Sequence, residues 1–177
     1  MSKMKGLFLL LTLLVFGESY AQKNDCTKYI KADFDKMTGD TTMKGKNTIV
    51  ALNNGKAISI ISTSYQKGDK DIFVVFKVLK GINCVDKNDK IYFLFTDKTR
   101  DWSYGRQLYN CKGQFVLMFG GTFGHILLDT LKNKLIKTIR LESSSGTIDF
   151  NLTQNQATTF QNQLLCLDTY LRPQESN

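Results

Sequence analysis

Short apolar or alternating runs, separated by turn residues, dominate the middle of the chain. Alternation with a period of two predicts strands, because successive side chains of a strand point to opposite faces. Asn53-Asn54-Gly55-Lys56 separates the runs 48–52 and 57–65, and Asn-Gly accepts the positive φ angles of a tight hairpin turn. Residues 72–79 are apolar except at Lys77, which predicts a strand covered on both faces.

The second half of the chain continues with strands and hairpins. The predicted strands are 90–96, 100–110, 114–119, 135–142 and 147–152. The first two form a hairpin around Asp97-Lys98, and the last two form another. Closing the loop between the last two places Glu142 opposite Thr147 and Arg140 opposite Asp149.

Two stretches have helical signatures. Residues 126–134 carry leucines on one side of a short helix, and the preceding Gly120, Gly121 and Gly124 predict a bend. Thr153 caps a longer helix, since Gln156 three residues later completes a capping box. The buried stripe of that helix is predicted to be Ala157, Phe160, Leu164 and Leu167.

The segment 26–37 fits two patterns. Ile30, Ala32 and Phe34 alternate with charged residues as in a strand, whereas Cys26, Tyr29, Ile30, Phe34 and Met37 also fit a helical stripe. We interpret the segment as a strand that ends in the turn Thr38-Gly39-Asp40.

Together these elements predict an α+β fold. We expect an antiparallel sheet of roughly eight or nine strands, bent or two-layered, with a C-terminal α-helix packed on one face. No linker-like stretch divides residues 22–171, which predicts a single domain followed by a polar tail at 172–177.

The first 21 residues have the pattern of a cleavable signal peptide. Lys3 and Lys5 precede an apolar run, and Ser19-Tyr20-Ala21 offers small residues for cleavage after Ala21. The run is too short for a mature membrane span, and no later stretch is apolar enough to cross a membrane. We therefore expect a periplasmic or secreted protein that has no membrane association once the signal is removed.

The four cysteines, Cys26, Cys84, Cys111 and Cys166, all follow the predicted cleavage site. An even number in an exported chain predicts two disulfides, with three possible connectivities. An unbroken hairpin centred between Asp97 and Lys98 would bring Cys84 opposite Cys111 and leave Cys26 for Cys166. A bulge or a longer turn would break this register.

The chain has a formal net charge of +8, which keeps a secreted domain soluble and could attract anionic polymers. The basic residues are spread out and are not interleaved with exposed aromatics, so no nucleic-acid partner is expected. The unknown partner is predicted to be a protein or a glycan.

Candidate chemistry is sparse. His125 is the single histidine and follows a glycine-rich turn, so the interpretation we favour is a loop or cap residue. The alternative is that His125 belongs to a ligand or partner surface. The spacing of Gly120, Gly121 and Gly124 fits neither dinucleotide-binding nor P-loop motifs. The acidic residues at 33–40 lack the glycine and glutamate of a calcium loop. No cofactor, metal or catalytic residue is assigned, and catalysis is not favoured.

Trp102, Tyr104 and Arg106 form the one pattern that suits a ligand surface, because they share a face at period two. Aromatics beside an arginine are typical of protein and carbohydrate contacts. The interpretation we favour is that Trp102 and Tyr104 line the core beneath the helix, as aromatic strand residues usually do.

The chain resembles small exported proteins of unknown function common in the Bacteroidetes. The features that carry the resemblance are residues 35–39, Tyr109-Asn110-Cys111, residues 119–124, residues 136–140 and the closing helix at 156–166. It implies export and brings no activity or site residues.

Three functions follow, in order of preference. The first is a non-catalytic binding domain with an exposed aromatic patch around Trp102 and no deep polar cleft. The second is a small enzyme with a polar pocket between sheet and helix, for which His125 is a candidate residue. The third is an inhibitor-like module whose sheet edge docks on a partner.

Overall fold

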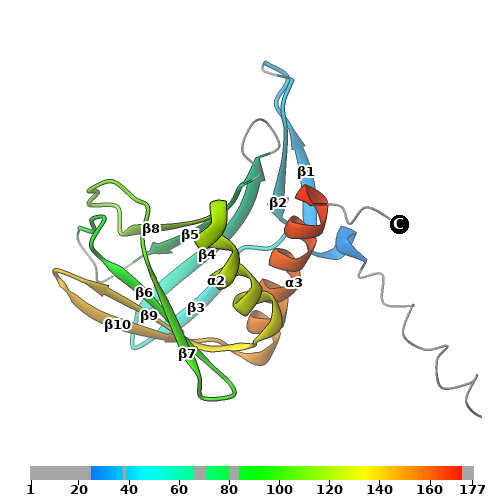
Figure 1. The fold of residues 1–177 in the computed structure, drawn as a ribbon. Helices are drawn as coiled ribbons and strands as arrows, with labels where there is room; N and C mark the ends of the chain where they lie inside the picture. The colour runs from blue at the N-terminus through cyan, green and yellow to red at the C-terminus, as the bar shows by residue number, and fades with distance from the viewer. Residues whose placement is uncertain (1–24, 38, 66–70, 80–83, 173–177) are drawn as a thin grey trace, which may run out of the picture.

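The computed structural model describes residues 25–37, 39–65, 71–79 and 84–172. Within them, ten strands form two antiparallel sheets and a long helix closes the chain (Figure 1). The predicted α+β fold is thereby confirmed. The predicted signal peptide at 1–21 and the tail beyond Arg172 lie outside the described residues.

Strands outnumber helices among the described elements. In order they are η1 (Cys26–Lys28), β1 (Ile30–Phe34), β2 (Thr41–Gly45), β3 (Ile49–Asn53), β4 (Lys56–Tyr65), β5 (Asp71–Val78), β6 (Lys90–Phe95), β7 (Arg100–Tyr104), β8 (Gln114–Phe119), α2 (Gly121–Asn133), β9 (Ile136–Ser143), β10 (Gly146–Asn151) and α3 (Gln154–Leu171).

The first sheet has the order β1-β2-β4-β5-β8, and β3 pairs with the other half of β4. The second sheet has the order β10-β9-β6-β7. The two sheets meet where β10 lies against β3. The helices α2 and α3 lie side by side against the sheets, as Figure 1 shows.

One aromatic cluster joins the two sheets and the C-terminal helix. The ring centroid of Phe76 on β5 lies 6.1 Å from that of Phe93 on β6 and 6.4 Å from that of Phe160 on α3. All three rings are buried, and tilted contacts at such distances add to the free energy gained by burying the rings. The core is therefore shared by both sheets and the helix.

Local signals explain the turns and the caps. Asn54 and Gly55 have φ angles of 47° and 75° and join the facing pair Asn53 and Lys56, as the Asn-Gly signal predicts. The hydroxyl of Thr153 accepts a hydrogen bond from the Gln156 N–H, and the Gln156 side chain accepts one from the Thr153 N–H. Both the hairpin and the capping box are confirmed.

The strand assigned to segment 26–37 is also confirmed, as β1, with η1 before it. Its neighbour β2 had no clear signal in the sequence.

Three sequence-based expectations are wrong. Residues 72–79 are not covered on both faces, because buried residues alternate along β5 with partly exposed ones. The strand predicted at 100–110 ends at Tyr104, where Gly105 is buried and the chain leaves the sheet. The glycines at 121 and 124 lie in the first turns of α2 instead of a bend. Gly124 suits the close approach of the chain there, since a Cβ would lie 3.1 Å from the Cα of Phe119.

Candidate functional site

The outer face of the second sheet carries an ordered set of polar and aromatic side chains. Asp149 faces Arg140, Arg140 faces Tyr92, and Tyr92 faces Trp102. This row therefore crosses all four strands, from β10 to β7. Residues that face each other in antiparallel strands point to the same side of the sheet, so the row lies on one surface.

Two parallel rows flank this central row. On one side Thr147, Glu142, Lys90 and Tyr104 face one another in turn. On the other side the row consists of Asn151, Thr138, Leu94 and Arg100. The alternate residues, such as Ile91, Phe93, Ile139 and Phe150, are buried in the core. The period-two pattern of these strands therefore separates a dry inner face from a mixed outer face.

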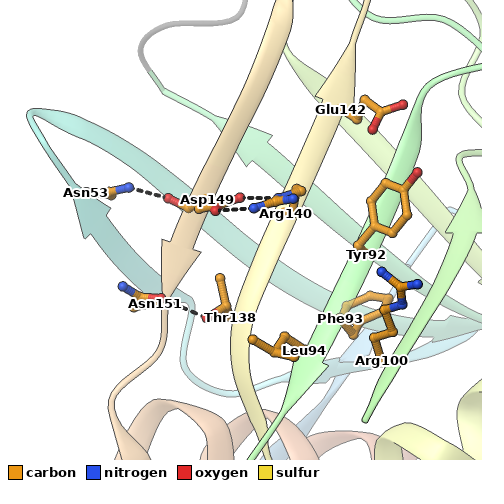
Figure 2. Close-up of a pocket in the computed structure, with 10 residues that line it drawn as sticks. All are labelled: Asn53, Tyr92, Phe93, Leu94, Arg100, Thr138, Arg140, Glu142, Asp149 and Asn151. Atoms are coloured by element: carbon orange, nitrogen blue, oxygen red, sulfur yellow. Dashed lines mark hydrogen bonds and ion pairs between the residues drawn. The ribbon is translucent and has the colours of Figure 1, made fainter. Parts of the chain in front are cut away.

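This outer face is hollowed into a groove of about 610 Å³ (Figure 2). The groove is lined by Asn53, Tyr92, Phe93, Leu94, Arg100, Thr138, Arg140, Glu142, Asp149 and Asn151. Asn53 comes from the β3–β4 hairpin of the first sheet and donates to the main-chain oxygen of Asp149 at 2.6 Å. The groove thus forms where the two sheets meet, and we call it the outer groove.

Arg140 and Asp149 form the best-defined polar pair of the outer groove. The guanidinium donates to both carboxylate oxygens, at 2.6 Å from Nε to Oδ1 and 2.8 Å from Nη2 to Oδ2. This hydrogen bonding with Arg140 lowers the pKa of Asp149 below its usual value, against the opposing effect of partial burial. The pair is ionised at neutral pH and presents a rigid, planar set of donors and acceptors.

An exposed aromatic patch continues the outer face beyond the groove. Trp102 is 47% exposed and Tyr104 is 48% exposed, and their ring centroids lie 5.1 Å apart at an interplanar angle of 88°. Tyr92 lies on the groove side of Trp102, with ring centroids 6.3 Å apart. The Lys90 ammonium lies 5.3 Å from the Trp102 ring centroid and 5.6 Å from that of Tyr104. The rings are held in place by one another and by this cation.

The favoured expectation that Trp102 and Tyr104 line the core is therefore wrong. Their strand, β7, is the last strand of its sheet, and its inward positions are the polar Asp101 and Ser103. The aromatic side chains are consequently on the outer face.

Arg106, grouped with these aromatics in the sequence, lies past the end of β7. Its backbone N–H donates to the Val116 carbonyl at 2.7 Å, so the chain at Arg106 lies beside β8. Arg106 does not line the outer groove. The side chain of Arg106 is exposed. The structure therefore brings Trp102 and Tyr104 together and leaves Arg106 apart from them.

His125 is neither a loop nor a cap residue, since it lies within α2. Its ring contacts the guanidinium of Arg172 after the end of α3. Arg172 also pairs with Asp168, and Asp168 pairs with Lys132 of α2 at 2.6 Å. His125 therefore belongs to a polar network that joins the two helices, away from the outer groove.

The region between sheet and C-terminal helix contains a small polar cluster. Nε2 of the buried Gln163 donates to the Asn47 carbonyl at 2.8 Å, and its Oε1 accepts from Ser62 at 3.3 Å. The nearby Ser64 hydroxyl is buried without a hydrogen-bond partner. These groups connect α3 to the sheet.

Two disulfides lie outside the groove. Cys26 is joined to Cys166, and Cys84 to Cys111, which is the connectivity that the hairpin register favoured. Two disulfides are typical of an oxidising compartment outside the cytoplasm. Among the described residues no helix has the length and apolarity of a membrane span. No group of acidic, histidine or cysteine side chains in the same residues has the arrangement of a metal site.

Most residues of the outer groove were missed from the sequence. Arg140 and Asp149 were paired correctly, but nothing local indicates that β6 pairs with β9. That pairing brings Tyr92 and Leu94 beside Arg140 and Thr138. The alternation of Tyr92 and Leu94 with buried Ile91 and Phe93 is the signal that could have indicated an outward face.

The chain matches no protein-family model, no curated protein and no solved structure. The geometry of the outer groove is therefore the basis for assigning a function.

Proposed function

We propose that this chain is an exported, non-catalytic binding domain that holds a polysaccharide along the outer face of its second sheet. The observation that carries the proposal is the continuity of the central row. The exposed Trp102, which contacts the Tyr104 ring of the flanking row, leads through Tyr92 to the Arg140–Asp149 pair.

The aromatic patch suits the apolar faces of sugar rings. A pyranose presents C–H groups on its faces, and these pack against aromatic rings. The rings of Trp102 and Tyr104 are close to perpendicular, so they offer one flat surface and one raised edge to a chain lying across β7 and β6. Because each ring is about half exposed, packing against a sugar would remove apolar surface from water.

The polar part of the groove suits sugar hydroxyls. Arg140 and Asp149 are fixed by two hydrogen bonds, and Thr138 donates to Asn151 at 2.8 Å. Hydroxyl groups both donate and accept, so a surface that alternates fixed donors and acceptors satisfies them without burying an unpaired charge. Figure 2 shows these side chains on two neighbouring strands, β9 and β10.

A binding role also suits the ionisation of Asp149. Because Arg140 lowers the pKa of this carboxyl, Asp149 is unsuited to donate a proton at neutral pH. Export is supported by the signal-peptide pattern of residues 1–21 and by the two disulfides. An exported polysaccharide-binding domain accounts for both the compartment and the surface.

Binding to soluble polysaccharides tests the proposal. The full chain would be expressed in a host, and the exported protein would be purified. This protein would then be run in native gels containing a neutral β-glucan, a neutral α-glucan or an acidic pectin. We expect retardation by at least one of these, and titration calorimetry then gives its affinity. Trp102→Ala should weaken that affinity about tenfold or more, as for other central aromatic contacts.

Tyr109→Ala is the matched control, because Tyr109 is 71% exposed but lies on no strand of the second sheet and in none of its three outer rows. It should bind like the wild type. A folded wild-type protein that binds none of the three polymers, or a Trp102→Ala variant that binds as well as the Tyr109→Ala variant, would contradict the proposal.

A further inference from the structure

The first sheet ends in a strand with a usable open edge. Within the described residues β1 pairs with β2 and with no strand on its other side. Asp35 donates its N–H to the Asp40 carbonyl, and Tyr29 accepts from the Lys46 N–H, so these odd-numbered residues turn their backbone groups toward β2. Because the backbone N–H and C=O groups of successive strand residues point to opposite sides, those of Ile30, Ala32 and Phe34 point to the open side.

The same three residues carry an apolar stripe beside a pocket. The pocket has a volume of about 390 Å³ and lies between β1 and the end of α3, where Ile30, Ala32, Met43 and Tyr170 line it. Phe34 lies farther along the stripe and is 60% exposed. The large apolar side chain of Phe34 is thus exposed to water, two residues beyond Ala32, which lines the apolar pocket.

We propose that β1 pairs with β1 of a second copy of this chain, antiparallel and centred on Ala32. In this register Ala32 faces the partner's Ala32, and each such pair exchanges two backbone hydrogen bonds. Ile30 faces the partner's Phe34 on the same side of the joined sheet. The Phe34 of each copy is then placed at the pocket beside Ile30 of the other.

The charges of β1 favour this register. Lys31 and Asp33 lie one residue to either side of Ala32, so Lys31 faces the partner's Asp33, and the reverse pair forms as well. A two-fold interface requires such self-complementarity. Within one copy Asp33 pairs with Lys44, and the hydrogen bond and charge of Lys44 lower the pKa of Asp33. An edge protected by lysine alone would repel a second edge, whereas this edge pairs basic with acidic residues.

The contact is small, so the dimer is expected to be weak. Five residues of β1 and one pocket on each copy bury less than a standard interface, and such contacts are transient. Analytical ultracentrifugation should show a weight-average mass that rises with concentration toward twice that of the monomer. The inference is independent of the polysaccharide proposal, because no residue of β1 lines the outer groove.

Two charge reversals give the decisive test. Lys31→Asp leaves only acidic residues at positions 31 and 33, and Asp33→Lys leaves only basic ones. Each variant alone should sediment as a monomer at concentrations where the wild type associates, because like charges then face each other. An equimolar mixture should associate again, because every facing pair becomes complementary.

Controls separate this contact from other modes of association. Lys36→Asp changes the charge equally but lies beyond β1, so it should associate like the wild type. Phe34→Ala should weaken association without a charge change. Circular dichroism checks that each variant folds. A wild type that remains monomeric at millimolar concentration, or single variants that associate as it does, would overturn the inference.

Discussion

Arg140 and Asp149 face each other across the β9–β10 hairpin and are joined by two parallel hydrogen bonds. Both side chains keep substantial exposure, at 53% and 37%. The pair is therefore partly screened by water and stabilises the fold little, while remaining accessible to a ligand.

Asp149→Asn should accordingly separate stability from binding. We expect the free energy of unfolding to fall by no more than about 1 kcal/mol, as for exposed ion pairs. Polysaccharide affinity should fall more, because the fixed bidentate geometry is lost. Urea unfolding and titration calorimetry measure the two effects. An equal loss in both would indicate that Asp149 acts only through folding.

The carboxyl of Asp97 should titrate below the usual aspartate pKa of 3.8, and the carboxyl of Asp89 should titrate above it. Hydrogen bonds from Thr99 and Lys134 lower the pKa of Asp97 to about 2, whereas burial raises the pKa of Asp89 above 3.8. The stability due to Asp97 is thus present above pH 3.8 and is lost as the pH falls toward 2. For Asp89 the sign is opposite, so stability decreases as the pH rises from 3.8 through its higher native pKa.

Carboxyl ¹³C shifts recorded by NMR between pH 2 and 7 check this order. Thr99→Ala should move the Asp97 titration back toward 3.8 and leave that of Asp89 unchanged. Similar midpoints for the two carboxyls in the wild type would contradict the prediction.

The two disulfides should differ in their contribution to stability. The sequence separations are 140 residues for Cys26–Cys166 and 27 for Cys84–Cys111. Because each bond restricts the unfolded chain, we expect the two disulfides to stabilise the fold by about 5 and about 3.5 kcal/mol, respectively. Replacing Cys26 and Cys166 by serine should therefore lower the urea midpoint more than replacing Cys84 and Cys111. The reverse order would mean that native-state effects outweigh chain entropy.

Gln163→Leu should destabilise the protein by about 1–3 kcal/mol, because the Asn47 carbonyl and the Ser62 hydroxyl lose their buried partner. Thermal unfolding followed by circular dichroism measures the loss. Asn155→Leu, at an exposed position of the same helix, serves as the control and should change stability by less than about 0.5 kcal/mol.

The predictable parts of the fold are those determined by neighbouring residues. The Asn54-Gly55 turn, the Thr153 cap and the facing of Arg140 and Asp149 depend on short segments and were anticipated. The turn after β6 was not, since Leu94 faces Arg100 and the turn is therefore centred on Asp97. Lys98 adopts a φ of 69° there, which its residue type does not announce.

The cysteine pairing shows how two irregularities can cancel. Near the turn, the β6–β7 hairpin is centred on Asp97 and not, as expected, between Asp97 and Lys98. At the far end, however, Val85 faces Asn110, and this pairing is the one expected for a centre between Asp97 and Lys98. An irregularity between these points restores the register beside Cys84 and Cys111. Non-local features, such as the pairing of β6 with β9 and the outward direction of Trp102, depend on the assembled sheets and were not accessible from local patterns.

The Cys26–Cys166 bond makes the domain a covalent ring. All ten described strands, α2 and most of α3 lie between these two cysteines in the sequence. A single peptide-bond cleavage anywhere in that interval opens the ring, but the two pieces stay covalently joined through the disulfide until a reductant is added. Exposed to a protease, the chain therefore remains one molecule after a first cut in that interval.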